Sequence, residues 1–456
     1  MEQVGWFNSC GVLVVLTRRT MLMKLALGAA GVASGAVPFQ LGNATSPKSF
    51  SFSSRDDLFL DELSQASFRL FWENSHPQTG LVRDLVVPGA NEINAVSSIA
   101  ATGFGLTALC IGAERGWVNR SDALARVRTT LRFLFNDMPH QNGFFHHFVD
   151  WQNGERAMMS EVSSIDTAIL ICGVLTCRQS FRDEEISDLA GKIYDRVNWK
   201  WLYRDGPFVS HGWTLERGFL ASSWDSYSEH MMLYLLAIGA NEHAIPAESW
   251  NTWNRPWVNS PGGGRYIEAS APIFIHQYSH AWIDFRGQQD GHTDYFENSQ
   301  AATLAHRQFC IELGREFPNY DENLWGITAS ESPKGYAVWG GPPKMGPIDG
   351  SVVPCAAGGS LPFAPELTMQ TLRHIRERHS NQSWGRYGFA DAFNPQSKWT
   401  AKHHISINTG ITLLMTENAR SGFVWETFMR NAEVKTAMRK VGFSGADDVF
   451  KSPILT

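Results

Sequence analysis

Residues 221–240 are ASSWDSYSEHMMLYLLAIGA, a polar segment followed directly by an apolar one. Residues 231–238 carry no charge, and a helix that is apolar on all sides belongs in a protein interior. Ser222 or Ser223 can cap a helix here, because a serine hydroxyl accepts a hydrogen bond from a backbone N–H group of the first turn. The stretch therefore predicts one buried helix over 222–240.

Two carboxylates lie in the polar half of this stretch. Asp225 and Glu229 are four residues apart and would share one helix face, with Trp224 and Tyr227 as aromatic neighbours. Asp225 at a helix N-terminus can simply complement the helix dipole. Glu229 would lie nearer the buried end, where a carboxyl group needs a reason to be, so it is the stronger candidate for chemistry.

The rest of the chain alternates between apolar and amphipathic segments with helical spacing. We expect apolar helices at 94–113, 163–179, 222–240 and 405–415. We expect amphipathic or polar helices at 57–74, 121–137, 184–199, 247–254, 365–379 and 423–441, and a further pair at 270–284 and 294–313. Apolar inner helices alternating about six times with amphipathic outer ones predict an all-α fold, an (α/α)6 barrel or toroid with long rim loops. An α-solenoid is the competing interpretation, but no repeat of fixed period supports it.

Strand-like alternation is scarce. Residues 146–151 and 335–339 are expected to form short hairpin pieces on the rim.

Composition narrows the class of protein. The chain has 456 residues, a net charge of -6 and no block of Lys or Arg, which argues against nucleic acid as a partner. Its 17 Trp are numerous enough for some to stack on sugar faces, although filling of the core accounts for most of them. The six Cys form no disulfide framework and have no zinc-site spacing, and we expect neither a metal nor a cofactor.

The N-terminal region resembles a targeting segment. Residues 17–24, TRRTMLMK, are similar to a twin-arginine export signal and precede a weakly apolar run. We therefore expect an export signal and leader over 1–45, a linker over 46–56 and one catalytic domain over 57–456. A misassigned start and a simple membrane anchor are the open alternatives. Export predicts a periplasmic or extracellular location with no membrane contact once the signal is removed, and we separately expect a monomer.

A second group of carboxylates precedes the apolar segment that begins near residue 163. Asp166 follows Ser163 at the spacing of a capping box, which would stabilise only the helix end. Glu161 lies before the cap and has no such duty, so it ranks above Asp166, with Asp150 as a further candidate. The adjacent His146 and His147 lack a third ligand at a suitable spacing for a metal site.

A D-x-H-x-D triplet lies further along the chain. Asp290, His292 and Asp294 could hold a divalent ion, but capping of the next helix by Asp294 is the favoured interpretation.

Paired carboxylates among aromatic residues indicate glycoside hydrolysis. One neutral carboxylic acid protonates the leaving oxygen while an ionised one activates water or attacks the sugar. Apolar surroundings at a helix end favour the neutral form of the acid.

Several long blocks carry a family resemblance. They are SSIAATGFGLTAL, SEVSSIDTAILICGVL, SWDSYSEHMMLYLLAIG, HQYSHAWIDFR, DYFENSQAA, LWGITASESPKGY, GSLPFAPE and WGRYGFADAFN. Together these blocks resemble the glycoamylase-like family of bacterial exported proteins, glycoside hydrolase family 144, over residues 59–442.

The resemblance implies an (α/α)6 fold and inverting hydrolysis of β-1,2-glucan, either endo-acting or releasing sophorose. It marks Glu229 as the general acid, and the base as one of Glu161, Asp166 and Asp150. Asn408 stands where some relatives have an acidic residue. The candidate substrate contacts are Trp224, Asp225, Tyr227, His211, Tyr278, Trp282, Arg286 and Trp325.

Two other functions stay open. A polysaccharide lyase on the same toroid would use Tyr with His or Arg against a uronic acid, and the acidic net charge argues mildly against a basic cleft of that kind. A noncatalytic glycan-binding protein would keep the aromatic cleft without turnover. The leading prediction is a hydrolase whose partner is a glucan oligo- or polysaccharide.

Overall fold

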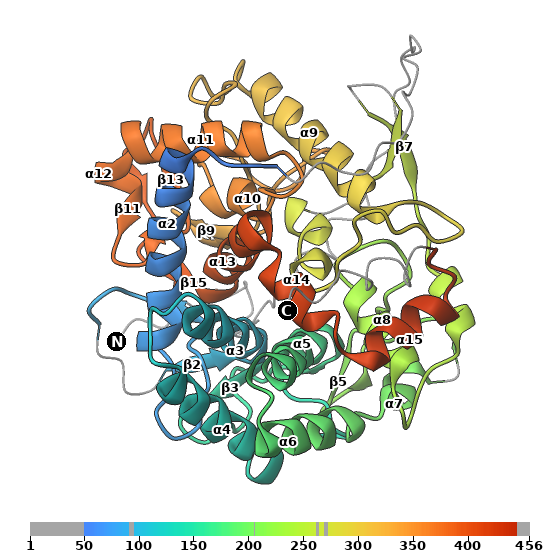
Figure 1. Cartoon of the computed structure of the whole chain (residues 1–456). Coiled ribbons are helices and arrows are strands. Elements are labelled where there is room, and N and C mark those ends of the chain that lie inside the picture. Colours follow the sequence, from blue (N-terminus) through green and yellow to red (C-terminus); the bar gives the residue numbers. More distant parts are fainter. Residues whose placement is uncertain (1–49, 91–94, 205, 261–263, 269–271, 445–456) are drawn as a thin grey trace.

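The computed structural model describes residues 50–90, 95–204, 206–260, 264–268 and 272–444. Within these ranges helices dominate (Figure 1). The α-helices are α2 (Ser54–Glu73), α3 (Ile99–Glu114), α4 (Arg120–Asn136), α5 (Ser164–Phe181), α6 (Glu184–Asp195), α7 (Trp199–Tyr203), α8 (Met231–Gly239), α9 (Tyr295–Leu313), α10 (Pro354–Gly358), α11 (Pro365–Arg378), α12 (Ser380–Ser383), α13 (Ser406–Ser421), α14 (Phe423–Phe428) and α15 (Ala432–Lys440). Three 3-10 helices are η1 (Ala247–Asn251), η2 (Ile273–His276) and η3 (Ser279–Ala281).

The strands are all two or three residues long. They are β1 (Leu85–Val86), β2 (Val96–Ser98), β3 (Phe148–Asp150), β4 (Val162–Ser163), β5 (Gly212–Thr214), β6 (Gly218–Phe219), β7 (Trp257–Asn259), β8 (Arg265–Ile267), β9 (Ser330–Ser332), β10 (Gly335–Ala337), β11 (Trp384–Gly385), β12 (Gly388–Phe389), β13 (Phe393–Asn394), β14 (Trp399–Thr400) and β15 (His404–Ile405). They pair antiparallel into ribbons of two or three strands, so none of the described sheets closes. The expected helix-rich class is confirmed, while the complete double ring stays a prediction.

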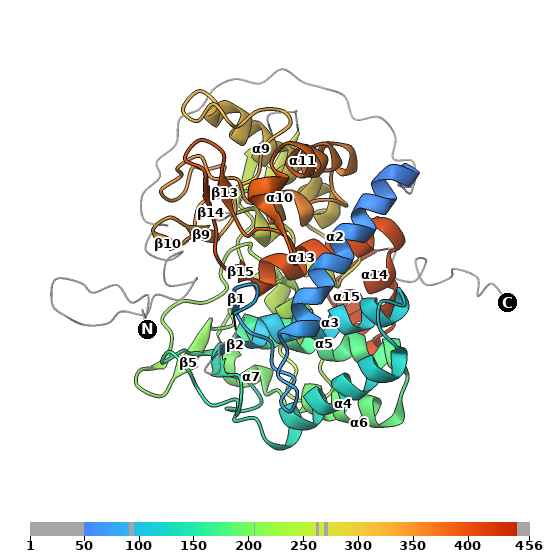
Figure 2. The same ribbon diagram turned by 90° about the vertical axis from the view of Figure 1, so that its left-hand side faces the viewer.

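The centre of the molecule is the pair α3 and α5. Both helices are buried along most of their length because nearly all their residues are apolar or small. At their crossing a Cβ added to Gly173 would lie 2.2 Å from the carbonyl oxygen of Gly103, so only glycine permits this approach. The amphipathic helices α4 and α6 lie outside them (Figures 1 and 2).

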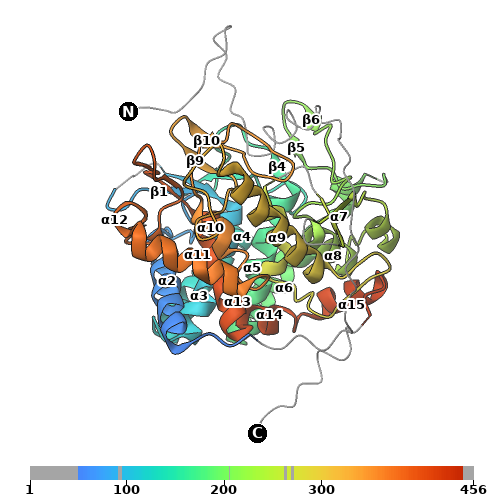
Figure 3. The ribbon, with the colours of Figure 1, turned by 90° about the horizontal axis from the view of Figure 1, so that it is seen from above.

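Three buried helices begin directly after a short strand. Helix α3 follows β2, α5 follows β4 and α13 follows β15. Strand β1 pairs with β15, β2 with β3 and β4 with β5, and these ribbons lie on one side of the molecule together with β9 and β10 (Figures 2 and 3). The N-terminal ends of the three helices are therefore brought to the same side of the molecule.

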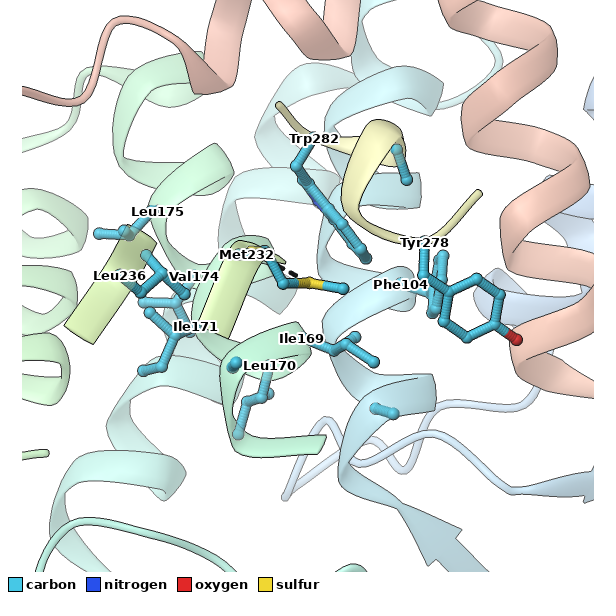
Figure 4. Packing of buried hydrophobic residues seen from close by; sticks show 14 of the residues in the cluster. Phe104, Ile169, Leu170, Ile171, Val174, Leu175, Met232, Leu236, Tyr278 and Trp282 are labelled. Atoms are coloured by element: carbon cyan, nitrogen blue, oxygen red, sulfur yellow. Dashed lines mark hydrogen bonds between the residues drawn. The ribbon is translucent and has the colours of Figure 1, made fainter. Parts of the chain in front are cut away.

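Side chains from four segments fill the core beneath these ends. Phe104 of α3, Ile169 of α5, Met232 of α8 and Trp282 pack together in one cluster (Figure 4). The indole N–H of Trp282 donates to Thr107 Oγ1 over 3.0 Å, which satisfies its polar atom within the core.

The helix predicted over 222–240 is wrong in its first half, because α8 begins only at Met231. The backbone N–H of Trp224 donates to the carbonyl of Val209, and that of Tyr227 donates to the carbonyl of Asn254. These bonds to distant segments replace the helical ones, so neither Ser222 nor Ser223 caps a helix.

The helix predicted over 270–284 is also wrong, because the described part of this segment forms only η2 and η3. The carbonyl of His280 accepts from Trp425 Nε1, and the carbonyl of Ala281 accepts from Asn418 Nδ2. Side chains of α13 and α14 thus take the acceptors that an α-helix would need.

Smaller differences follow from local contacts. The helix predicted over 423–441 breaks into α14 and α15, where Asn431 Oδ1 accepts hydrogen bonds from Arg178 and Gln179. Residues 146–151 include β3, which pairs with β2, and Val149 also forms an antiparallel bridge with Arg156 just after it, so this piece of a hairpin is present. The hairpin near 335–339 is confirmed by β9 and β10.

Helix α2 begins at Ser54, three residues before the expected start at residue 57, while the division into linker and catalytic domain stays a prediction. No helix of the described ranges has the length and apolarity needed to cross a membrane. The expected export signal and leader lie outside the described residues.

Candidate functional site

A hollow lies at the N-terminal ends of α5 and α13 and just before α8. It encloses about 490 Å³ of unfilled space, a volume that includes solvent at its mouth. Its lining residues are His147, Asp166, Ile169, Glu229, Phe274, Tyr278, Ala329, Tyr336, Ile407 and Asn408. The hollow thus joins two carboxylates, one histidine, one amide and three aromatic rings.

Glu229 lies in the turn that leads into α8. The residue is only 5% exposed, and its Oε2 accepts a hydrogen bond from Ser228 Oγ. Ser279 Oγ donates to the carbonyl of Glu229 over 2.7 Å and accepts the N–H of Met232 over 3.0 Å. The serine therefore fixes the start of α8, and with it the backbone that carries the carboxyl group.

Asp166 faces the same hollow from the first turn of α5. Its backbone N–H donates to Ser163 Oγ, and that hydroxyl donates back to Asp166 Oδ2. Ser163 therefore caps α5 as expected, but its backbone N–H donates to the carbonyl of Phe145 and not to Asp166, so the second bond of a capping box is not made. The bond from Ser163 Oγ does not exclude chemistry at Asp166, because the carboxylate also lines the hollow.

Glu161 lies behind this position and is joined to it by His147. His147 Nδ1 is 3.2 Å from Glu161 Oε1, and His147 Nε2 is 3.7 Å from Asp166 Oδ1. All three residues are buried, and Glu161 does not appear in the lining of the hollow. The sequence ranked Glu161 above Asp166 as a candidate, but in the structure Asp166 lines the hollow. Glu161 is separated from Asp166 by His147 and does not line the hollow.

The three side chains could together hold a metal ion. One ligand atom from each of His147, Glu161 and Asp166 lies within 4.8 Å of the other two. The expectation that His147 lacks further ligands was wrong, because β3 and the N-terminus of α5 bring in partners that sequence spacing did not reveal. The imidazole nevertheless directs a different ring nitrogen at each carboxylate, an arrangement that suits a bridging histidine better than a chelate.

Asp150 is not part of this group. It lies at the end of β3, where its Oδ1 accepts the backbone N–H of Gln152 in the following turn. The Asp150 carboxylate thus stabilises the turn that follows β3, and Asp150 does not line the hollow.

The aromatic candidates divide into one lining residue and four core residues. Tyr278 lines the hollow beside Phe274. Trp224, Tyr227, Trp282 and Trp325 are buried in the hydrophobic clusters and do not line it. Trp224 Nε1 donates to Ser164 Oγ at the start of α5, so this ring supports the site from below.

The remaining candidate contacts lie away from the lining. Asp225 is exposed, and His211 packs its ring against Trp224 with centroids 4.1 Å apart. Arg286 pairs with Asp284 and lies over the ring of Trp425. None of the three faces the hollow.

The D-x-H-x-D segment serves structure in the described chain. Asp294 Oδ1 accepts the N–H groups of Phe296 and Glu297, which confirms the capping interpretation. Asp290 accepts from Trp250 Nε1 and from the hydroxyl of Tyr295. Both carboxylates are thereby occupied without an ion.

Two buried histidines, His276 and His280, lie in η2 and η3 and do not line the hollow. Burial lowers the pKa of His276 to about 3, and burial lowers the pKa of His280 to about 3. His276 Nδ1 is 3.2 Å from the hydroxyl of Tyr227, and His280 Nε2 is 3.0 Å from Ser299 Oγ. Both rings are neutral hydrogen-bonding groups rather than charges.

Sequence reasoning missed five lining residues, which are Ile169, Phe274, Ala329, Tyr336 and Ile407. Tyr336 comes from the β9–β10 hairpin, whose presence was predicted but whose direction was not. No local sequence pattern marks these residues, because they come from segments that are far apart in the sequence and meet only in the folded chain.

Comparison with known proteins gives a consistent set of relatives. Residues 221–432 match the family model described as "Putative glucoamylase". A curated relative from Parabacteroides distasonis, an exo beta-1,2-glucooligosaccharide sophorohydrolase (non-reducing end), is 27% identical over 424 residues. The match covers 85% of this chain but 58% of the relative, so the chain spans little more than half of that protein's length.

Solved structures extend the likeness to nearly the whole described chain. An endo-beta-1,2-glucanase from Chitinophaga pinensis, in complex with sophorotriose and glucose, has a TM-score of 0.79 and 27% identity, over 87% of this chain and 99% of that chain. A beta-1,2-glucanase from Parabacteroides distasonis has a TM-score of 0.79 and 26% identity, over 85% of this chain and 60% of that chain.

Proposed function

Because the chain belongs to the glycoamylase-like family, we propose that it is a glycoside hydrolase that cleaves β-1,2-glucan by an inverting acid/base mechanism. The single observation that carries the proposal is the placement of Glu229 and Asp166 in one hollow with aromatic walls. These carboxylates come from segments 63 residues apart in sequence (229 minus 166). A pair of carboxyl groups flanking a sugar is what glycosidic bond hydrolysis requires.

In the proposed reaction Glu229 is the general acid. Its carboxyl proton passes to the glycosidic oxygen as the bond between that oxygen and the anomeric carbon breaks. Ser228 Oγ and the bond from Ser279 Oγ to the backbone hold the acid in place. An enzyme gains most from groups that are already oriented before substrate arrives.

Asp166 is the proposed base. It takes one proton from a water molecule whose oxygen forms the new bond to the anomeric carbon, so each carboxyl group ends the cycle in the opposite protonation state. Loss of this proton from Asp166 to solvent and uptake of one by Glu229 would restore both groups, while His147 lies between Asp166 and Glu161 and would hold the base in place. Asp166 is preferred over Glu161 because only Asp166 lines the hollow.

The wider setting of the proposal follows the sequence expectations. The fold is proposed to be an (α/α)6 toroid whose inner helix ends form the cleft, and the enzyme to act as an exported monomer in the periplasm or outside the cell. Its substrate would be a linear glucan, cut internally or from a chain end with release of sophorose.

The test is turnover of linear β-1,2-glucan by the wild type and by Glu229→Gln. We expect the wild type to generate reducing ends and the variant to lose at least about a hundredfold in kcat, the usual scale for a general acid. Glu242→Gln is the matched control, since Glu242 is exposed beyond the other end of α8 and should keep wild-type turnover. Equal activity of wild type and Glu229→Gln would refute the assignment of the acid.

The base and the stereochemistry have separate tests. Asp166→Asn should lower kcat by a similar factor, and Glu161→Gln by less. Proton NMR of the first product formed should give the α-anomer of the reducing end if a β-linkage is inverted. Formation of the β-anomer would contradict the inverting mechanism, and binding of glucan without any turnover would support a noncatalytic glycan-binding protein instead.

A further inference from the structure

Asn408 separates two hollows at the N-terminal end of α13. It lines the hollow that contains Glu229 and Asp166, and it also lines a neighbouring one with about 280 Å³ of unfilled space. The second hollow is lined by Leu63, Ser67, Pro354, Cys355, Tyr387, Phe389, Ala390, Asp391, Asn408, Thr409 and Thr412. A polar side chain in the wall between two cavities is available to whatever enters them.

The orientation of the Asn408 amide is determined by its partners. Its Nδ2 donates to the carbonyl oxygen of Ala329 over 3.0 Å and to Asp391 Oδ1 over 2.8 Å. A carbonyl oxygen and a carboxylate oxygen only accept hydrogen bonds, so the nitrogen has to face them. Both amide hydrogens are thereby used.

Asp391 is itself held as an acceptor. Its Oδ2 accepts the backbone N–H of Glu331 over 2.8 Å, and the residue is 5% exposed. Since one donor meets each of its oxygens, the ionised form of Asp391 satisfies both bonds. Asp391 lines the second hollow and not the first, so the carboxylate holds the amide from the second hollow.

The remaining atom of the amide is its oxygen. Among the described residues no donor reaches Asn408 Oδ1, whereas the comparable Asn418 Oδ1 on the same helix accepts the N–H of Trp425. An amide cannot take up a proton at this position, so Asn408 cannot act as a base. It can only accept a hydrogen bond.

We propose that Asn408 Oδ1 accepts a hydrogen bond from a hydroxyl donor bound in the cleft, and that Asp391 is the positioning residue that keeps this oxygen turned toward it. The inference rests on the proposed function, under which the donor is a hydroxyl group of the glucan or the hydrolytic water. A site built to bind a hydroxyl discriminates strongly against its absence, because the buried acceptor is then left unpaired.

The activity test compares Asn408→Leu and Asp391→Asn with Asn418→Leu. Asn418 is the matched control because it is a buried amide on the same helix whose bonds lie wholly within the protein. We expect kcat/KM on β-1,2-glucan to fall about thirtyfold in Asn408→Leu and about tenfold in Asp391→Asn. Asn418→Leu should keep kcat/KM within about twofold while losing at least as much thermal stability as Asn408→Leu.

The kinetic constants distinguish a sugar hydroxyl from the hydrolytic water as the donor to Asn408 Oδ1. Loss of a bond to a sugar hydroxyl raises KM, whereas loss of a bond to the attacking water lowers kcat with KM unchanged. Wild-type kcat and KM in Asn408→Leu would overturn the inference and leave the proposed function intact. A wild type that leaves the glucan uncut would overturn both.

A second measurement tests the role of Asp391 without turnover. In protein labelled with 15N-asparagine, the side-chain amide protons of Asn408 should exchange slowly with solvent in the wild type and at least about tenfold faster in Asp391→Asn. Exchange that is equally slow in both proteins would show that Asp391 does not hold the amide.

Discussion

The helix pair α3–α5 and the segment 221–286 differ in how their sequences relate to their structures. Each helix of the pair is capped by the serine before it, since Ser98 Oγ accepts from Ala101 and Ser163 Oγ accepts from Asp166. In the described part of segment 221–286, backbone groups bond instead to residues outside the segment such as Val209, Asn418 and Trp425. The pair is specified locally, whereas the segment is specified by the surrounding fold.

This difference teaches where a site can form. A continuous helix satisfies its own backbone and leaves side chains in regular positions. The irregular segment places Glu229, Phe274 and Tyr278 in one hollow because its turns are free of helical spacing. The conformation of this segment depends on hydrogen-bond donors from neighbouring elements such as α13 and α14. We therefore expect the segment to lose its structure more easily than the helix pair.

The largest expected effect comes from breaking the rigid region. In Gly173→Ala the new Cβ would lie 2.2 Å from the carbonyl of Gly103, and backbone atoms cannot move aside cheaply. We expect the free energy of unfolding, measured in urea, to fall by about 3 kcal/mol or more. Gly191→Ala in α6 is the control, since nothing lies within 4 Å of its added Cβ, and it should leave stability unchanged or raise it by up to about 1 kcal/mol.

The second largest effect is expected from a lower pH, which should destabilise the irregular segment before the helix pair. Burial lowers the pKa of His276 to about 3 and that of His280 to about 3, while both are near 6.5 in the unfolded chain. Below pH 6.5 the unfolded state binds protons that the folded state does not, so stability falls as the pH drops. The loss at pH 5.5 is about 1 kcal/mol for each histidine.

The measurement is hydrogen exchange of residues 272–284 and of α3 and α5 between pH 7 and 5.5, corrected for the intrinsic exchange rate. Protection should decline in the segment before it declines in the helix pair, and His276→Gln should weaken the decline. Burial raises the pKa of Asp294 to about 6, so this carboxyl gains a proton in the folded state and offsets part of the loss. Equal loss of protection in both regions would contradict the comparison.

A smaller effect is expected from the serine that joins the segment to α8. Ser279→Ala removes the bonds to the carbonyl of Glu229 and to the N–H of Met232. We expect kcat on β-1,2-glucan to fall about tenfold, because the acid is less well positioned. Ser383→Ala is the control, since Ser383 is also buried and donates to a backbone carbonyl, that of His379 four residues earlier, without lining the hollow. Its turnover should match the wild type.

The smallest effect is expected from removal of metal ions. Each ring nitrogen of His147 already faces a different carboxylate, so catalysis by the row of three residues needs no ion. Dialysis against EDTA should leave kcat unchanged, and elemental analysis should find less than one equivalent of bound divalent metal. Loss of activity that an added divalent ion restores would assign the three residues to a metal site.

Local patterns were sufficient for the regular part of the fold. Helices α2, α3, α4 and α5 lie close to their predicted ranges, because apolar spacing and capping residues act within a few neighbours along the chain. The same patterns failed at 222–230 and 270–284, where distant donors and acceptors capture the backbone.

The sequence by itself determined the helix-rich class, the buried helices, the capping roles of Ser163 and Asp294, and the candidate Glu229. Only the tertiary structure decided that Asp166 and not Glu161 or Asp150 lines the hollow, that His147 bridges two carboxylates, and that four of the five predicted aromatic contacts belong to the core. The physical reason is range: helix capping and apolar periodicity act over a few residues, whereas a cavity is defined by atoms that the chain brings together from elements hundreds of residues apart.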